Sequence, residues 1–198
     1  MQKVYGDTAS GNCYKVKLLL EQLQLPYTWV AIDILKKESR TPEFLQKNPS
    51  GQIPLLEIEP GAYLPESNAI LHYLADGSNF LPKDPLEHAQ VLRWMFWEQY
   101  SHEPNVASAR FIVRYLGNPP EHAQTLKRRI ADGHLALQLM ERHLERERYF
   151  AGGRYTIADI SLYAYTHVAE EGGISLTPYP SIRRWLDAVR AQANHVGM

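Results

Sequence analysis

The sequence predicts an α/β domain followed by an all-helical domain, and three observations lead to this fold class. Over the first 77 residues, apolar residues switch between helical spacing and short strand-like runs. Beyond residue 85 the strand signals vanish and only helical spacing continues. A stretch from Gly77 to Pro85 has the composition of a linker and separates the two parts. We therefore expect an α/β domain at 1–77, a linker at 78–85 and an all-helical domain at 86–198.

The chain begins with a predicted β-α-β unit. Residues 3–5 are typical of a short strand, and a helix follows from Cys13. This helix is expected to stop at Pro26, because proline lacks the N–H that a helix interior requires. Residues 27–33 are rich in β-branched and aromatic side chains, which favour a strand.

The rest of the first domain predicts a helix, a hairpin and another helix. Thr41 precedes proline and is suited to cap a short helix. Residues 55–58 and 62–64 are strand-like and flank a Glu-Pro-Gly turn, as in a hairpin. Helical spacing returns over 66–75, and Gly77 is well placed as a left-handed C-cap. The predicted order is β-α-β-α-β-β-α.

The second part predicts a helical bundle. Asp84, followed by proline, begins a long helix, and Pro104 within it predicts a kink. After a break at 118–120, an apolar stripe runs along a charged helix over 126–144. Residues 156–159 form a capping box in which aspartate replaces the usual glutamate. A last amphipathic helix completes the bundle.

Composition excludes several classes of protein. Hydrophobic residues make up 44% of the 198 residues and charged residues 22%, which is typical of a globular protein. The formal net charge of −1 argues against nucleic acid as a partner. No stretch of about 18 apolar residues predicts a membrane span. The eight scattered histidines and the single cysteine predict no metal site and no disulfide, so we expect a cytoplasmic protein.

The element order, with a proline before the hairpin and a helical bundle appended, resembles the glutathione transferase superfamily over essentially the whole chain. The resemblance implies a thioredoxin-like first domain, glutathione as co-substrate and no prosthetic group. It is carried by local matches in the family's order: Ser10-Gly11-Asn12, Gln52-Ile53-Pro54, Glu66-Ser67 and Thr156 to Asp159.

Glu66 and Ser67 open a predicted helix, and their simplest reading is a good helix start. In the family resemblance, this pair holds the γ-glutamyl end of glutathione. A zwitterionic α-amino acid needs donors for its carboxylate and an anion for its ammonium group. A helix N-terminus that carries Glu-Ser supplies both.

Ile53 and Pro54 form an ordinary turn or, as the resemblance implies, a cis peptide bond. The Ile53 backbone would then pair with the cysteinyl backbone of glutathione like a short antiparallel strand, with Gln52 beside it. The glycyl carboxylate requires a cation. Lys36, Lys37 and Arg40 are the candidates, although these residues are equally typical of a solvated loop.

Ser10 and Asn12 are the candidate catalytic residues, because the resemblance places the glutathione sulfur at this helix start. Two alternatives stay open. Tyr5 is another hydroxyl donor, although it lies before a longer loop. Cys13 is a candidate nucleophile for thiol transfer, or simply a packed small side chain.

The second substrate is expected between Ser10 and the long kinked helix, where aromatic and small polar residues cluster. From this cluster we select four residues for the second-substrate pocket: Trp97, Ser101, Asn105 and Ser108.

We therefore expect a detoxifying glutathione transferase that directs the glutathione thiolate to a small hydrophobic electrophile or a peroxide. The family resemblance implies a homodimer. The alternatives are a Cys13-dependent thiol transferase or lyase and a non-catalytic binding module that keeps the fold.

Overall fold

The computed structural model describes residues 1–198 and divides them into two units. The first comprises Met1–Ser78 together with Ala193–Met198, and the second comprises Asn79–Gln192. None of the helices combines the length and the apolar character that crossing a lipid bilayer requires.

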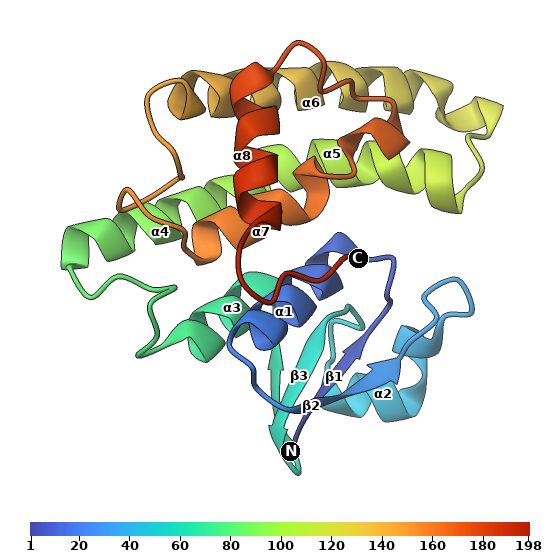
Figure 1. Cartoon of the computed structure of the whole chain (residues 1–198). Coiled ribbons are helices and arrows are strands. Elements are labelled where there is room, and N and C mark those ends of the chain that lie inside the picture. The colour runs from blue at the N-terminus through green and yellow to red at the C-terminus, as the bar shows by residue number, and fades with distance from the viewer. The chain divides into compact units, whose positions relative to one another are not determined.

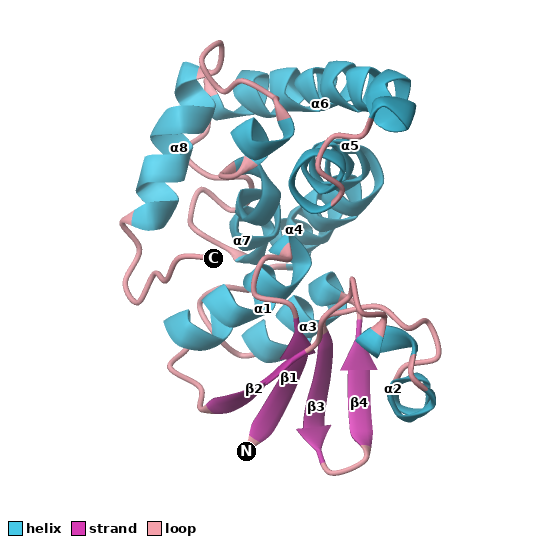
Figure 2. Cartoon of the chain, turned by 90° about the vertical axis from the view of Figure 1, so that its right-hand side faces the viewer, coloured by secondary structure: helices cyan, strands magenta, loops and turns pink.

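A four-stranded mixed sheet forms the centre of the first unit (Figure 2). The strands lie in the order β2-β1-β3-β4. β1 is parallel to β2 and antiparallel to β3, which in turn is antiparallel to β4. Their bounds are Gln2–Gly6 for β1, Tyr27–Ala31 for β2, Leu55–Glu59 for β3 and Ala62–Pro65 for β4.

Helices cover both faces of this sheet (Figure 1). α1 (Gly11–Gln22) and α3 (Ser67–Ala75) pack together on one face. The short 3₁₀ turn η1 (Glu38–Arg40) leads into α2 (Pro42–Lys47), which lies on the other face. The order β-α-β-α-β-β-α is the predicted one, which confirms the thioredoxin-like fold class.

Local signals explain where these helices begin and end. Ser10 is the N-cap of α1, so the helix starts at Gly11, two residues before the predicted start. Thr41 caps α2, as expected, by accepting a hydrogen bond from the backbone N–H of Phe44. Gly77 follows α3 with φ of +70°, the left-handed conformation expected at that position.

The second unit is entirely helical apart from one isolated bridge between Ala151 and Arg154, which confirms the predicted helical domain. Short 3₁₀ turns at Pro120–His122 and Ala169–Gly172 connect its elements. Every residue of α7 is buried, so this helix forms the centre of the bundle. The helices are α4 (Pro85–Trp97), α5 (Glu103–Arg110), α6 (Ala123–Leu144), α7 (Ile157–Thr166) and α8 (Pro180–Arg190).

Two π-helical turns interrupt the long helix that the sequence predicts after Asp84. The first is η2 (Glu98–His102), and the second is η3 (Phe111–Tyr115), which follows α5. Pro104 lies in the first turn of α5, directly after η2. Because proline cannot donate to the carbonyl four residues earlier, a change of hydrogen-bond register at this point lets the helix continue.

Asp159 ties the start of α7 to two other segments. The predicted capping box with Thr156 is present. The Asp159 carboxyl also accepts hydrogen bonds from the backbone N–H of Phe150, at 3.1 Å, and from the indole N–H of Trp185, at 2.9 Å. A second buried acid, Glu141 of α6, accepts from the first backbone N–H groups of α8.

Candidate functional site

The loop before α1 presents a serine hydroxyl at the helix N-terminus. Asp7 shapes the loop, because its carboxylate accepts from the backbone N–H of Ala9 at 2.8 Å and its carbonyl accepts from that of Ser10. The Ser10 hydroxyl oxygen then accepts a 3.4 Å hydrogen bond from the backbone N–H of Cys13. Since a hydroxyl both accepts and donates, the Ser10 proton can still be donated to an anion in front of the helix.

Asn12 and Ser67 join the starts of two helices that are far apart in the sequence. The Ser67 hydroxyl donates to the Asn12 side-chain oxygen, with an oxygen–oxygen distance of 3.3 Å. Ser67 is the first residue of α3 and is buried. The structure thus brings two of the sequence-predicted segments together at one end of the α1–α3 pair.

Glu66 precedes α3 in an unusual backbone conformation. Its φ is +72° and its ψ is 110°, although the residue is not glycine. Such a conformation costs about 1–3 kcal/mol and is often found at ligand sites. The Glu66 side chain is exposed, so its carboxylate is available to a ligand beside the buried Ser67.

The segment before β3 contains the predicted cis peptide bond, between Ile53 and Pro54. Pro54 is buried and Ile53 is half-buried. Asn48, the C-cap of α2, organises this segment. Its side chain donates to the Gln52 carbonyl at 2.9 Å and accepts from the backbone of Ser50 at 3.2 Å. The Gln52 side chain itself is exposed.

Lys36 and Arg40, the candidate cations for the glycyl carboxylate, have different partners in the structure. The Lys36 ammonium group lies 3.1 Å from the Asp33 carboxylate, and both groups are solvent-accessible. Arg40 donates at 2.8 Å to the Ser50 carbonyl, and a β-carbon on Gly51 would come within 2.5 Å of its guanidinium group. Arg40 is therefore fixed against the loop that leads to the cis peptide bond, whereas Lys36 is not.

Cys13 does not have the surroundings of a nucleophile. Its side chain is 0% exposed, and a β-carbon on Gly6 would come within 2.9 Å of its sulfur. Burial raises the pKa of the Cys13 thiol to about 12, against weaker lowering by the Ser10 hydroxyl and the Asp7 backbone. A reactive cysteine needs an exposed thiolate with a lowered pKa, so the structure argues against the Cys13 alternative.

Tyr5 lies on the α2 side of the sheet, away from α1. Its ring packs edge-on against Phe44, with 6.3 Å between ring centroids. Its hydroxyl donates to the Glu57 carboxylate at 2.7 Å. Burial, and then this hydrogen bond, raise the pKa of Tyr5 to about 12. Tyr5 thus has a structural partner on the opposite face and is not placed to serve the α1 N-terminus.

The four second-substrate candidates lie in the helical unit. Trp97 ends α4, Ser101 lies in η2, and Asn105 and Ser108 belong to α5. All four side chains are half-buried. Trp97 packs edge-on against Trp94, with 5.3 Å between centroids.

Arg129 of α6 was not predicted from the sequence but holds one of these candidates. It donates at 3.0 Å to the side-chain oxygen of Asn105, whose amide group donates to the Ser101 carbonyl at 2.8 Å. The Asn105 amide is therefore fixed from both ends. Arg129 and Asn105 are 24 residues apart, so no local sequence pattern connects them.

Comparisons with known proteins show the family of the chain. The family models for the glutathione S-transferase N-terminal and C-terminal domains match residues 4–79 and 105–193. A crystal structure of a glutathione S-transferase from Pseudomonas fluorescens Pf-5 is similar, with 54% identity and a TM-score of 0.97, covering 99% of this chain and 98% of that one.

Two further similar proteins are more distant. The disulfide-bond oxidoreductase YfcG of Escherichia coli is 27% identical over 188 residues, which cover 91% of this chain and 86% of YfcG. A second Pseudomonas fluorescens Pf-5 structure, described as a glutathione transferase family member with two glutathione bound, has 27% identity and a TM-score of 0.86. The match covers 98% of this chain and 89% of that one.

Proposed function

The chain belongs to the glutathione S-transferase family, and from this premise we propose that it activates the thiol of glutathione for attack on a small hydrophobic electrophile or a peroxide. One observation carries the proposal. The hydrogen bond between Ser67 and Asn12 joins the start of α3 to the start of α1, which Ser10 caps. A helix start that carries Glu-Ser suits the charged groups of an amino acid, and this supports the proposal.

Glu66 and Ser67 receive the γ-glutamyl end in this proposal. The buried Ser67 and the N-terminus of α3 donate to its carboxylate, while the exposed Glu66 carboxylate takes its ammonium group. The Ile53 backbone, beside Pro54, pairs with the cysteinyl backbone of glutathione. The glutathione bound to a 27% identical family member supports this choice of ligand.

Gln52 and a cation receive the other end of the tripeptide. Arg40 is the better-supported cation, because its hydrogen bond to Ser50 fixes it against the Gln52 loop. Lys36 is the second candidate, although its pairing with Asp33 holds it elsewhere in the loop.

Ser10 is the residue that we propose stabilises the thiolate, and Asn12 supports it by holding Ser67. The unperturbed thiol pKa is about 8.5, and lowering it by about two would require roughly 2.7 kcal/mol. A hydrogen bond to a charged group contributes about 1.5–3 kcal/mol, and a helix N-terminus about 0.3–1 kcal/mol. One hydroxyl at the start of α1 is therefore sufficient, and no general base is needed.

We further propose that Trp97, Ser101, Asn105 and Ser108 bind the second substrate, since one aromatic wall with a few fixed polar groups suits an apolar electrophile. We also propose a homodimer. Its support is an exposed aromatic surface on the helical unit, where Phe96 is 70% and Tyr100 86% exposed.

The test measures the thiol pKa of glutathione bound to the wild-type protein and to variants. The ultraviolet absorbance of the thiolate is recorded as a function of pH. We expect Ser10→Ala to return this pKa toward that of free glutathione and to lower kcat by roughly 10- to 100-fold. Thr8→Ala, which removes an exposed hydroxyl from the same loop, is the control and should leave both unchanged. An unaltered pKa in the Ser10→Ala/Asn12→Ala double variant refutes the mechanism.

A substrate panel separates the remaining alternatives. It contains a halogenated aromatic, an organic peroxide and a small disulfide, the last because a 27% identical relative is named a disulfide-bond oxidoreductase. Cys13→Ser should keep all activities, because the buried thiol takes no part. Loss of only the disulfide activity would restore the Cys13 mechanism, and failure to bind immobilised glutathione would favour a non-catalytic module.

A further inference from the structure

The helical unit carries two neighbouring cavities around the C-terminal end of α6. The first, of about 460 Å³, lies between the end of α6 and α8. The second, of about 430 Å³, lies between the end of α6 and α4. Both have Glu145 and Arg146 in their lining, so they adjoin. We call the two together the arginine groove, and each part has the volume of a small-molecule site.

Arginine dominates the lining. Five arginines face two glutamates, which gives the groove a net charge of +3 in a chain whose formal net charge is −1. Burial lowers the pKa of His143, which favours the neutral imidazole. The five are Arg93, Arg142, Arg146, Arg148 and Arg184.

None of these five arginines forms an ion pair. Five arginines elsewhere do pair with carboxylates, among them Arg110 with Glu171 at 2.8 Å and Arg128 with Asp132 at 3.5 Å. Because arginines outnumber carboxylates in the lining and none of the five is ion-paired, an anion that enters the groove gains their attraction without breaking an existing ion pair.

Three of the guanidinium groups are held in place. Arg184 donates at 2.7 Å to the Leu144 carbonyl at the end of α6. Arg93 lies over the ring of Trp94, 4.4 Å from its centroid, and Arg148 lies 5.4 Å from the ring centroid of Tyr149. Held guanidinium groups lose less freedom when they bind a planar or tetrahedral anion. The buried indole N–H of Trp94 has no acceptor within the protein.

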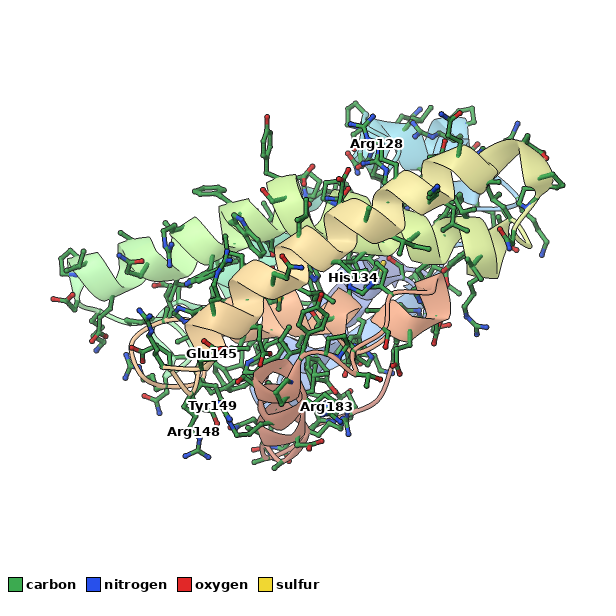
Figure 3. All side chains as sticks on the ribbon, turned by 90° about the horizontal axis from the view of Figure 1, so that it is seen from above. Arg128, His134, Glu145, Arg148, Tyr149 and Arg183 are labelled. Carbon is green, nitrogen blue, oxygen red and sulfur yellow. The ribbon has the colours of Figure 1, made fainter.

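The groove is local. Figure 3 shows Glu145 and Arg148 at the end of α6 beside α8, whereas Arg183 projects from the opposite side of α8. Arg128 lies toward the other end of α6 in the same view. The positive charge is thus concentrated at one end of the bundle, and neighbouring arginines outside it provide matched controls.

We propose that the arginine groove binds a small organic polyanion through phosphate or carboxylate groups, one over each cavity. Arginine suits both groups, because its planar fork donates two parallel hydrogen bonds to a pair of oxygens. Two adjoining hollows of small-molecule volume, lined by guanidinium groups of which three are held in place, favour a small molecule over a flat protein partner. None of the residues that line the groove is among those proposed for glutathione, which belong to the first unit.

The experiment is calorimetric titration of the full chain with tripolyphosphate and, separately, with citrate, at low and at physiological ionic strength. The two arms distinguish phosphate from carboxylate chemistry. We expect saturable binding of at least one probe, weakened by salt. Arg146→Gln, which alters both cavities, should weaken binding by about 10-fold or more. Arg183→Gln, on the far side of α8, should change it by less than about 2-fold.

The result is decisive in either direction. No saturable binding at low ionic strength overturns the proposal, as does equal weakening by Arg146→Gln and Arg183→Gln. Sedimentation of the same variants tests for a second copy in the groove. If Arg146→Gln alters the oligomeric state and leaves polyanion binding unchanged, the groove is a subunit interface and the proposal is wrong. Both substituted side chains are exposed, so folding should be unaffected.

Discussion

Removal of the Asp159 carboxyl should be among the most destabilising single changes in the helical unit. In Asp159→Ala, three buried donors lose their acceptor: the backbone N–H groups of Phe150 and Thr156 and the indole N–H of Trp185. Each unsatisfied buried donor costs about 1–3 kcal/mol. Allowing for partial relaxation, we expect a loss of about 3–6 kcal/mol, against a typical total stability of about 5–15 kcal/mol.

The assay is urea unfolding, monitored by far-ultraviolet circular dichroism. This signal does not depend on Trp185, which is substituted in one of the backgrounds. Asp187→Ala is the control, because that carboxylate is 72% exposed and pairs only with Arg190. It should cost less than about 0.5 kcal/mol. In a Trp185→Phe background the indole donor is absent, so Asp159→Ala should cost at least about 1 kcal/mol less. A loss below about 1 kcal/mol, or equal losses in the two backgrounds, would refute the reasoning.

Three further predictions follow. Burial raises the pKa of Asp159 to about 7, above its unfolded value of about 3.9, so the folded state holds the proton more tightly. The advantage of wild type over Asp159→Asn in unfolding free energy should therefore shrink as pH rises from about 4 to about 7, and a growing advantage would contradict this. Burial raises the pKa of the Cys13 thiol to about 12, so this thiol should react slowly with a disulfide reagent at pH 8. We expect the rate in the folded chain to be lower by about 100-fold or more than in the urea-unfolded chain. Equal rates would mean that the thiol is accessible in the folded chain. Glu141→Ala should lower stability by about 2 kcal/mol, because Glu141 accepts hydrogen bonds at 2.8 and 2.9 Å from the first two backbone N–H groups of α8. Thermal unfolding measures this loss. The control is Gln138→Ala, on the exposed side of α6, which should have little effect in the same measurement.

The fold was predictable where a short segment carries its own signal. Ser10, Thr41, Asp84 and Thr156 each cap the helix that follows, and a cap needs only its nearest neighbours in the sequence. The two π-helical turns were not predictable in this way. Proline removes a hydrogen bond in any helix, but whether the chain kinks or changes register depends on packing against other helices.

The candidate site was predictable in outline and not in its connections. Ser67 and Asn12 are 55 residues apart, and no periodicity predicts that their side chains meet. Asn48 and Arg129 were missed for the same reason, since each supports a candidate residue through a contact made only in three dimensions. Family resemblance named the residues that we propose bind glutathione, whereas the structure was needed to find the residues that hold them in place.

The sequence left two sulfur chemistries open: activation of the glutathione thiol at Ser10 and nucleophilic attack by Cys13. The positions of these two residues at the start of α1 distinguish them. Ser10 and Cys13 are three residues apart, but Ser10 is the N-cap and stays half-buried at the helix end, while Cys13 points toward the sheet and lies against Gly6. The same hydrogen bond that fixes this turn, from the Cys13 backbone to the Ser10 hydroxyl, leaves the Ser10 proton available for donation. This turn therefore supports the proposal of a glutathione thiolate at the N-terminus of α1 over a Cys13 thiolate on the side that faces the sheet. If the chain reduces disulfides, we propose that glutathione, and not Cys13, supplies the sulfur that attacks the disulfide.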